Sequence, residues 1–269
     1  MNATSLGTSA ARKFIDFNLR ISQWENSLVS RLIPRKNGLE DFRKRVVPGL
    51  LKPEMRVLDV GGGRSPLISP KTVKDLRLHV VGLDISHQEL LDAPEGSYNE
   101  VVVGDVSDVP IPGKFDLILS KTVLEHVRDN RRAILNLTRA MGDGGIMAHY
   151  VPNRYAPFAL INQLIGNKLA RKVLNYIHPH RKHIVGFQAY YNKCVPSQMK
   201  HLCEDCGMEV VELTPYFTSD YFEFFTPIHM LDLCRQVCMS ILRASDLAET
   251  FIIITRMPRS NGHQLNIVS

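Results

Sequence analysis

The feature that most constrains this chain is an apolar strand that ends in a tight glycine turn. The strand and turn read Val57-Leu58-Asp59-Val60-Gly61-Gly62-Gly63, and a second apolar run ends in Asp84. Glycine lets the backbone approach a ligand closely because no Cβ stands in the way. An acid at the end of the next strand accepts hydrogen bonds from ribose hydroxyls. The pattern predicts a doubly wound α/β sheet with a nucleoside site at the carboxyl ends of its strands.

The details of the turn favour one kind of nucleoside. A dinucleotide site uses G-x-G-x-x-G, so that a pyrophosphate lies on a helix N-terminus. Here Pro66 stands at the third glycine, and Asp59 would repel a pyrophosphate. A carboxylate at this place suits a cationic ligand that carries an amino-acid ammonium group. These two residues argue against a hydride-transferring reductase.

The order of motifs resembles the class I S-adenosylmethionine (SAM) methyltransferases, in their small-molecule, type 11 branch. Their motif I is [DE]-x-G-x-G-x-G, which Asp59, Gly61 and Gly63 match while Ser65 replaces the last glycine. Further matching blocks follow in order at 101–106, 115–127 and 144–151. The resemblance implies SAM as cofactor and S-adenosylhomocysteine (SAH) as product. It implies these cofactor-binding residues: Asp59, Gly61, Gly62, Gly63, Asp84, Ile85, Asp105, Val106 and Ser120.

For two of these acidic residues, a purely structural role is an alternative to cofactor binding. Asp105 also fits a helix N-cap, since aspartate is favoured there. Asp59 also fits a buried carboxylate that is paired for structure alone. The missing last glycine of motif I leaves open a SAM-binding scaffold or regulatory subunit without turnover.

The apolar runs predict strands near 55–60, 79–84, 100–104, 115–120, 144–151, 209–213 and 249–256. The resemblance implies one seven-stranded, mostly parallel sheet whose last strand is antiparallel. We expect an N-terminal extension over 1–46 and a methyltransferase domain over 47–269. Apolar cap insertions are expected at 153–193 and 215–248, the second mostly a helix over 227–243. They would either shape a hydrophobic acceptor pocket or pack on one another.

An amphipathic helix is predicted over 12–33, after a disordered start at 1–11. Its apolar residues recur every three or four positions, which places them on one stripe: Phe14, Phe17, Ile21, Trp24, Leu28 and Leu32. Pro34 would end the helix. A lid over the SAM pocket fits a stripe that packs on the core. An interfacial helix on a membrane is the alternative.

Positive charge is concentrated in two segments. Residues 1–56 carry 11 basic and 5 acidic side chains, and residues 144–203 carry 8 basic and none acidic. A field of this sign attracts an anionic acceptor or an anionic lipid surface. The basic balance also raises nucleic acid as a partner, but neither the Pro-Pro motif of DNA adenine methylases nor an RNA-binding module is present, so nucleic acid is disfavoured.

Methyl transfer to oxygen needs a base, and histidine is the usual choice. His126 follows the fourth strand, and the resemblance implies that the loop at this place lines the acceptor pocket. A second candidate is His180, in the turn His178-Pro179-His180-Arg181-Lys182-His183. This turn would bind phosphate or carboxylate through His178, Arg181 and His183, with Tyr191 nearby; a solvated loop is the alternative.

Other classes of site and location are disfavoured. The five cysteines predict reduced thiols, and Cys203-x-x-Cys206 lacks the four ligands of a structural zinc site, so no metal is expected. With no apolar run of transmembrane length and no signal-like N-terminus, we expect a cytoplasmic protein, at the inner face of a membrane if the helix is interfacial.

These observations predict a SAM-dependent methyltransferase that acts on oxygen of a hydrophobic, lipid-linked or glycan-type anionic acceptor. A soluble small metabolite or sugar is the alternative acceptor. The sequence does not indicate an oligomeric state.

Overall fold

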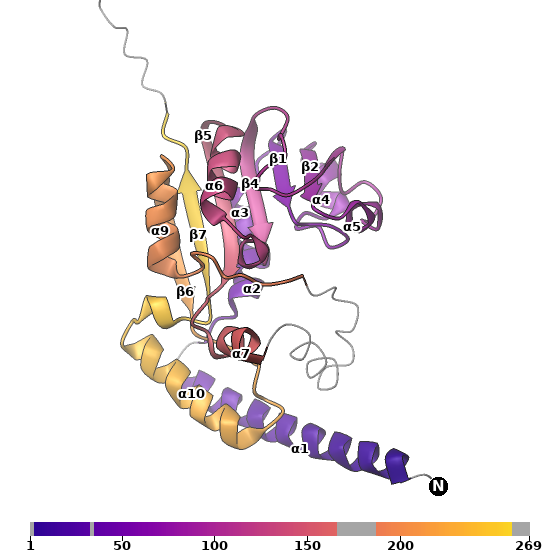
Figure 1. The fold of residues 1–269 in the computed structure, drawn as a ribbon, viewed down its shortest axis with the longest axis vertical. Helices are drawn as coiled ribbons and strands as arrows, with labels where there is room; N and C mark the ends of the chain where they lie inside the picture. Colours follow the sequence, from indigo (N-terminus) through magenta and orange to yellow (C-terminus); the bar gives the residue numbers. More distant parts are fainter. Residues whose placement is uncertain (1–2, 33–34, 166–186, 260–269) are drawn as a thin grey trace, which may run out of the picture.

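The computed structural model describes residues 3–32, 35–165 and 187–259. It contains one seven-stranded sheet in the order β3-β2-β1-β4-β5-β7-β6 (Figure 1). The strands are β1 (Arg56–Val60), β2 (His79–Asp84), β3 (Glu100–Val103), β4 (Phe115–Lys121), β5 (Met141–Pro152), β6 (Glu209–Tyr216) and β7 (Thr250–Arg256). The predicted doubly wound α/β fold is confirmed.

The last strand runs against its neighbours, as the resemblance implied. β7 pairs antiparallel with both β5 and β6, whereas the other paired strands are parallel. The fifth strand begins at Met141 rather than near 144, because Met141 pairs with Phe115 before a register shift. Residues 142–145, which precede or begin the predicted strand, therefore lie within its irregular first part.

Helices connect the strands and cover both faces of the sheet (Figure 1). Three helical turns precede β1: α2 (Gly38–Asp41), a π-helical turn (Phe42–Val46) and α3 (Val47–Leu50). Between strands lie α4 (Pro70–Asp75), α5 (His87–Leu91), α6 (Asn130–Arg139) and α9 (Pro196–Asp205). Short 3-10 turns occur at Leu124–His126 and Ser245–Leu247.

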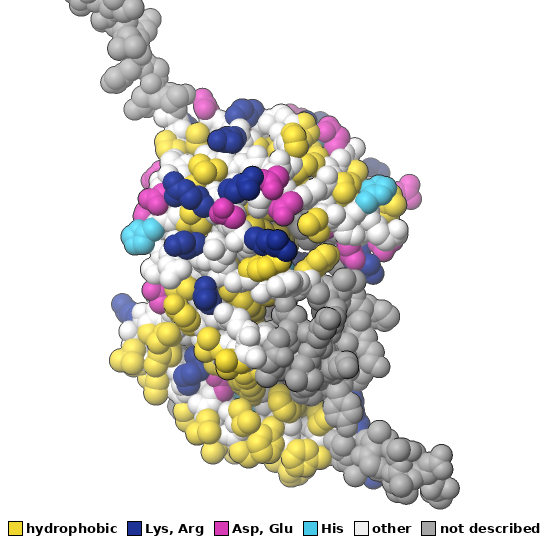
Figure 2. All heavy atoms as spheres, viewed as in Figure 1, with side chains coloured by type: hydrophobic (Ala, Val, Ile, Leu, Met, Phe, Trp, Pro, Cys, Tyr) yellow, Lys and Arg dark blue, Asp and Glu magenta, His cyan; other side chains and the backbone are white. Residues whose placement is uncertain are grey.

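Three helices lie at the end of the molecule toward which the parallel strands point. They are α1 (Ala3–Leu32), α7 (Pro157–Ile165) and α10 (Thr226–Ile241). α1 begins at Ala3, well before the predicted start at Arg12, and it packs against α10. Hydrophobic side chains gather on the surface at this end (Figure 2). None of the helices in the described part of the chain is long and apolar enough to cross a membrane.

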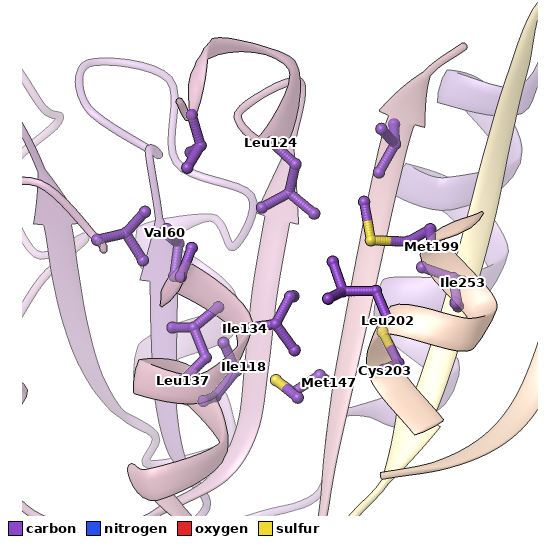
Figure 3. Close-up of a cluster of buried hydrophobic side chains, with 14 of the residues drawn as sticks. Val60, Ile118, Leu124, Ile134, Leu137, Met147, Met199, Leu202, Cys203 and Ile253 are labelled. Carbon is purple, nitrogen blue, oxygen red and sulfur yellow. The ribbon is translucent and has the colours of Figure 1, made fainter. Parts of the chain in front are cut away.

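The core lies in two layers, one on each face of the sheet. On one face α6 and α9 contribute Ile134, Leu137, Met199 and Leu202, which pack on Ile118 and Met147 (Figure 3). Cys203 and Cys206 belong to this same layer, and all five cysteines are free thiols. The Cys-x-x-Cys pair thus contributes to packing. The other layer is centred on Phe42, Val57, Leu117 and Ile252.

Candidate active site

A cavity of about 530 Å³ opens at the carboxyl ends of β1, β2, β3 and β4. These ends meet at the centre of the sheet, where the strand order reverses between β1 and β4. In open α/β sheets this is where ligands bind. The walls come from the ends of the four strands and the segments that follow them: Val60 and Gly61; Leu83 to Ile85; Gly104 to Asp108; and Thr122, Val123, His126 to Asp129 and Arg132, with Phe187, Gln188 and Tyr190.

The glycine turn requires glycine for a geometric reason. Gly61 has a φ of 68°, and a Cβ there would overlap the Val123 side chain. Its backbone N–H donates to the carbonyl oxygen of Leu83 at 2.6 Å, which ties the turn to β2. At Gly62, an added Cβ would lie 2.5 Å from Asp59 Oδ2 and closer still to the Tyr98 hydroxyl. The loop therefore packs directly on polar side chains beneath it.

Asp59 lies beneath this turn and is fully buried. Its Oδ2 accepts a hydrogen bond from the Leu67 backbone N–H at 2.9 Å, whereas Oδ1 is buried without a partner. Burial raises its pKa to about 6, against the lowering effects of the Leu67 bond and of Lys121. Asp59 is not among the residues that line the cavity, so in this structure its contacts are with the glycine loop.

Asp84 and Ile85 follow β2 and line the cavity. Asp84 is 8% exposed, and its Oδ1 accepts a hydrogen bond from the Ser86 backbone N–H at 2.9 Å. Its pKa is raised, mainly by burial. Hydroxyl donors from a ribose would offset that desolvation, because hydrogen bonds to a carboxylate favour its charged form.

Asp105 and Val106 form the next part of the wall. Asp105 Oδ1 accepts a hydrogen bond from the Ser107 backbone N–H at 2.8 Å, so the carboxylate stabilises a turn rather than capping a helix. The Val106 side chain is buried and offers an apolar surface. An apolar wall beside hydrogen-bonding groups is the usual composition of a small-molecule site.

His126 lies at the side of the cavity formed after β4, and its ring nitrogens have distinct roles. Nδ1 is 3.1 Å from the carbonyl oxygen of Gln188. A carbonyl only accepts, so Nδ1 carries the proton and Nε2 holds the lone pair. Burial lowers the pKa of His126, which keeps the ring neutral at pH 7. The Phe187 ring packs against it edge to face, with centroids 6.2 Å apart.

Glu125 is a group that the sequence reasoning missed. Its side chain is buried, its Oε2 has no partner, and burial raises its pKa to about 8. Its Oε1 is 3.7 Å from His126 Nε2, and its backbone carbonyl accepts from the N–H groups of Tyr190 and Tyr191. The sequence did carry a signal of this burial, because Glu125 lies among the apolar residues of the segment Val-Leu-Glu-His-Val.

Two cations also line the cavity without having been predicted. Arg128 Nε donates to the Tyr190 hydroxyl at 2.8 Å, and its guanidinium lies over that ring at 5.2 Å from the centroid. Arg132 is ion-paired with Asp108. Arg128 therefore places a positive charge at the side of the cavity where His126 lies, and this charge suits an anionic group on the methyl acceptor.

Several predicted site residues lie elsewhere. Ser120 is buried in the sheet, where its Oγ is 2.7 Å from Nδ1 of the equally buried His149. Tyr191 is buried behind the His126 turn. Neither they nor Gly62 and Gly63 line the cavity. The remaining predicted residues lie outside the described residues: His178, His180, Arg181 and His183. Within the described ranges, no three His, Cys, Asp or Glu side chains group as metal ligands do.

The residues present fit SAM. A turn that excludes side chains at Gly61, a buried carboxylate at Asp84 and an apolar wall at Val106 surround one cavity. The carboxylate would hold the ribose and the wall beside Asp105 the adenine. The glycine turn would lie against the amino-acid part.

Comparison with known proteins agrees with this reading of the site. The family model described as "Methyltransferase domain" matches residues 33–213, which is more than half of the chain. It includes the glycine turn and all four strands whose carboxyl ends form the cavity.

Two curated relatives are both named "Ubiquinone biosynthesis O-methyltransferase". The protein from Thiobacillus denitrificans is 26% identical over 164 residues, covering 59% of this chain and 66% of the relative. The one from Colwellia psychrerythraea is 25% identical over 166 residues, covering 59% and 63%. The matched region thus spans slightly less than two thirds of each relative.

Solved structures show the same fold. Phosphoethanolamine N-methyltransferase 2 of Haemonchus contortus, in complex with SAM, matches with a TM-score of 0.51 and 14% identity, covering 81% of this chain and 53% of that one. A SAM-dependent methyltransferase from Mesorhizobium loti matches with a TM-score of 0.51 and 15% identity, covering 78% and 95%.

Proposed function

We propose, because this chain belongs to the class I SAM-dependent methyltransferases, that it transfers a methyl group to a hydroxyl oxygen of a hydrophobic, lipid-linked acceptor with anionic character. Bound SAM supplies a methyl group that its sulfonium already activates. The contribution of the chain is then to position the acceptor, remove its proton and exclude water.

The observation that carries the proposal is the state of His126. Its Nδ1–H is held by the Gln188 carbonyl, so the basic Nε2 is the nitrogen left to take a proton from a hydroxyl. Its lowered pKa keeps that nitrogen unprotonated at neutral pH. Transfer to oxygen needs such a base, because a neutral hydroxyl is a weak nucleophile.

The hydrophobic and anionic character of the acceptor has separate support. Phe187, Val123 and Val127 give the cavity an apolar wall on the His126 side, while Arg128 adds a cation there. The two curated relatives are named for O-methylation in ubiquinone biosynthesis, which favours oxygen over nitrogen as the acceptor atom.

Methyl transfer from labelled SAM to a panel of phenols and lipid-linked hydroxyl compounds tests the proposal. His126→Gln should lower the rate by about 10²–10⁴-fold, the usual contribution of a general base, with SAH affinity unchanged. His201→Gln is the matched control, because His201 lies exposed on α9. A His126→Gln enzyme with wild-type rate would refute the base, and an inactive wild type that still binds SAH would favour a scaffold role.

A further inference from the structure

Hydrogen bonds of polar side chains join α1 to the start of α10 and to the residues just before it. Asn18 is buried, and its Oδ1 accepts a hydrogen bond from the Thr226 backbone N–H at 2.9 Å. Ser22 is fully buried beside the Thr226 hydroxyl, at 3.5 Å. Asn26 Nδ2 donates to Glu223 Oε1 at 2.7 Å. Apolar contacts add to these hydrogen bonds, because Ile15 of α1 is buried and the Phe14 ring lies 6.3 Å from the ring of Phe225 at the start of α10.

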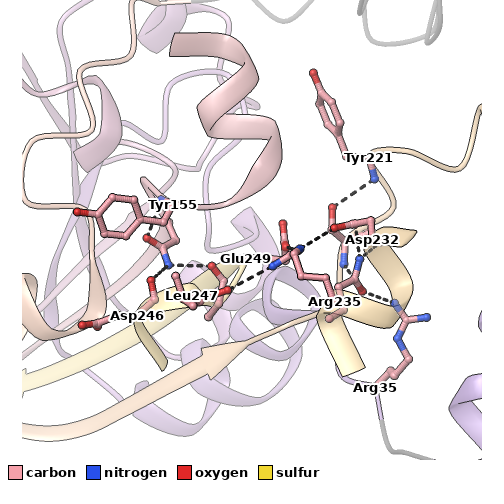
Figure 4. Close-up of polar contacts among 12 residues, drawn as sticks. Arg35, Tyr155, Tyr221, Asp232, Arg235, Asp246, Leu247 and Glu249 are labelled. Atoms are coloured by element: carbon pink, nitrogen blue, oxygen red, sulfur yellow. Dashed lines mark hydrogen bonds and ion pairs between the residues drawn. The ribbon is translucent and has the colours of Figure 1, made fainter. Parts of the chain in front are cut away.

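The charged side chains of α10 form contacts with the rest of the protein. Gln236 donates to Asp232 Oδ2 at 2.7 Å and accepts from Arg35 at 2.5 Å, and Arg235 pairs with both Asp232 and Glu249 (Figure 4). Asp232, Gln236 and Glu249 are buried. Both charged residues of α10 thus lie on the side that faces the rest of the protein.

The outward side of α10 is apolar along its whole length. None of the exposed residues between Pro227 and Ile241 is charged. These exposed residues include four large apolar side chains and two cysteines: Ile228, Met230, Leu231, Ile241, Cys234 and Cys238.

The apolar stripe predicted on α1 is exposed too. Phe14 is 54% exposed, Phe17 63%, Trp24 65% and Leu28 47%. We refer to these four residues and the exposed apolar residues of α10 as the apolar face. Figure 2 shows hydrophobic side chains gathered over the end of the molecule where Figure 1 places α1 and α10.

On α10 this arrangement is the reverse of an ordinary surface helix, which buries its apolar side and exposes its charges. Leaving many large apolar side chains in water forgoes the stabilisation of burial, so such a surface marks an interaction site. We propose that the apolar face binds the surface of a lipid bilayer that contains anionic lipids.

Charge favours a bilayer over a second copy of this chain. The exposed charged residues described on α1 are four cations and one acid: Arg12, Lys13, Arg20, Arg31 and Asp16. Arg243 adds a cation directly after α10. Anionic headgroups would pair with these cations while the apolar side chains enter the boundary with the acyl chains. In a symmetric dimer through the same face, the cations would meet their own copies.

The position of the apolar face fits a lipid-linked acceptor, although the evidence for membrane binding does not depend on that acceptor. α7 follows the carboxyl end of β5, and α10 follows that of β6, which runs parallel to β5. The apolar face is therefore at the end of the sheet where the cavity opens. A protein bound to a membrane by this face would have its active site turned toward the lipids.

Trp24 is the sole tryptophan of the chain, so its fluorescence reports on this face alone. The experiment adds vesicles of equal parts phosphatidylglycerol and phosphatidylcholine to the full-length protein. We expect the emission maximum to move to shorter wavelength and the protein to float with the vesicles. Neutral phosphatidylcholine vesicles and high salt should weaken both effects, because the cations then lose their partners.

Leu231→Glu and Leu91→Glu form a matched pair, since these leucines are 71% and 63% exposed and Leu91 lies on α5. We expect Leu231→Glu to weaken vesicle affinity by roughly tenfold or more and Leu91→Glu to leave it unchanged. Equal effects of the two, or no wavelength change with anionic vesicles, would overturn the proposal. A wavelength change that depends on protein concentration without lipid would also overturn it, in favour of self-association. Because no turnover is measured, these results are independent of the methyl-transfer proposal.

Discussion

Replacing Gly62 by alanine tests how the glycine turn is supported. The added Cβ would lie 2.5 Å from Asp59 Oδ2 and 2.7 Å from its Cγ, so either the loop or the buried carboxyl must move. Overpacking of a filled site costs about 1–3 kcal/mol. If Asp59 turns away, its bond from Leu67 N–H is lost as well, and bonds to charged groups contribute about 1.5–3 kcal/mol. Alanine also lowers the conformational entropy of the unfolded chain, which stabilises the protein by only about 0.4–1 kcal/mol.

We therefore expect Gly62→Ala to lower the free energy of unfolding by about 2–4 kcal/mol. SAH affinity should fall with it, since movement of the loop displaces Gly61 at the cavity wall. Urea denaturation followed by circular dichroism gives the first quantity, and titration calorimetry the second. Gly49→Ala is the control: Gly49 lies in α3 with nothing within 4 Å of an added Cβ, so this variant should keep or gain stability. A Gly62→Ala protein that matches the wild type in both measurements would refute the reasoning.

Three further predictions concern protonation and the second insertion. Glu125 has a folded pKa of about 8, above its unfolded value, so it stabilises the fold at low pH and this stability is lost as the pH rises through 8. Between pH 6.5 and 8 this group should lower the free energy of unfolding by about 1–2 kcal/mol; in urea titrations Glu125→Gln should remove that share of the slope, while Glu223 and Glu249, with pKa values of about 7, keep theirs. The lowered pKa of His126 places the acidic limb of kcat/KM below pH 6.5, and a limb above pH 7 would contradict its role as base. Asn153, fully buried, donates to the carbonyls of Asp246 and Ala248, so Asn153→Ala should lower thermal stability by about 1–3 kcal/mol, whereas an unchanged melting temperature would show that these bonds are replaced.

Most of the fold could be predicted because its signals are local. Each of β1, β2 and β3 is an apolar run that ends at a glycine or an acid, and the predicted bounds of β2 agree with the structure. The cofactor side of the site follows from the same pattern, which is why Gly61, Asp84, Ile85, Asp105 and Val106 all line one cavity.

The acceptor side was less predictable because it depends on contacts between distant segments. The carboxyl of Glu125 is buried where the backbone of Tyr190 and Tyr191 crosses it, and nothing in the local sequence indicates that crossing. Ser120 ends a strand as a cofactor residue would, yet its hydroxyl faces His149 on the neighbouring strand. Pattern reasoning locates a strand end but not the face toward which a side chain there points.

The N-terminal helix shows a different limit. Its 3.6-residue period identifies an apolar stripe, and the stripe exists. Periodicity does not say what covers the stripe, however. On the described part of α1 the packed side contains the polar Asn18 and Ser22, which contact Thr226 of α10, together with the apolar Ile15. None of the described residues of α1 lines the cavity.

The central claim is that the cavity at the carboxyl ends of β1 to β4 holds SAM through Asp84. Calorimetric titration of SAH into the wild type and into Asp84→Ala tests it most directly. The account predicts binding to the wild type and a loss of about 1.5–3 kcal/mol in the variant, the contribution of hydrogen bonds to a charged group. Absent binding to the folded wild type, or equal affinity for both proteins, would contradict it.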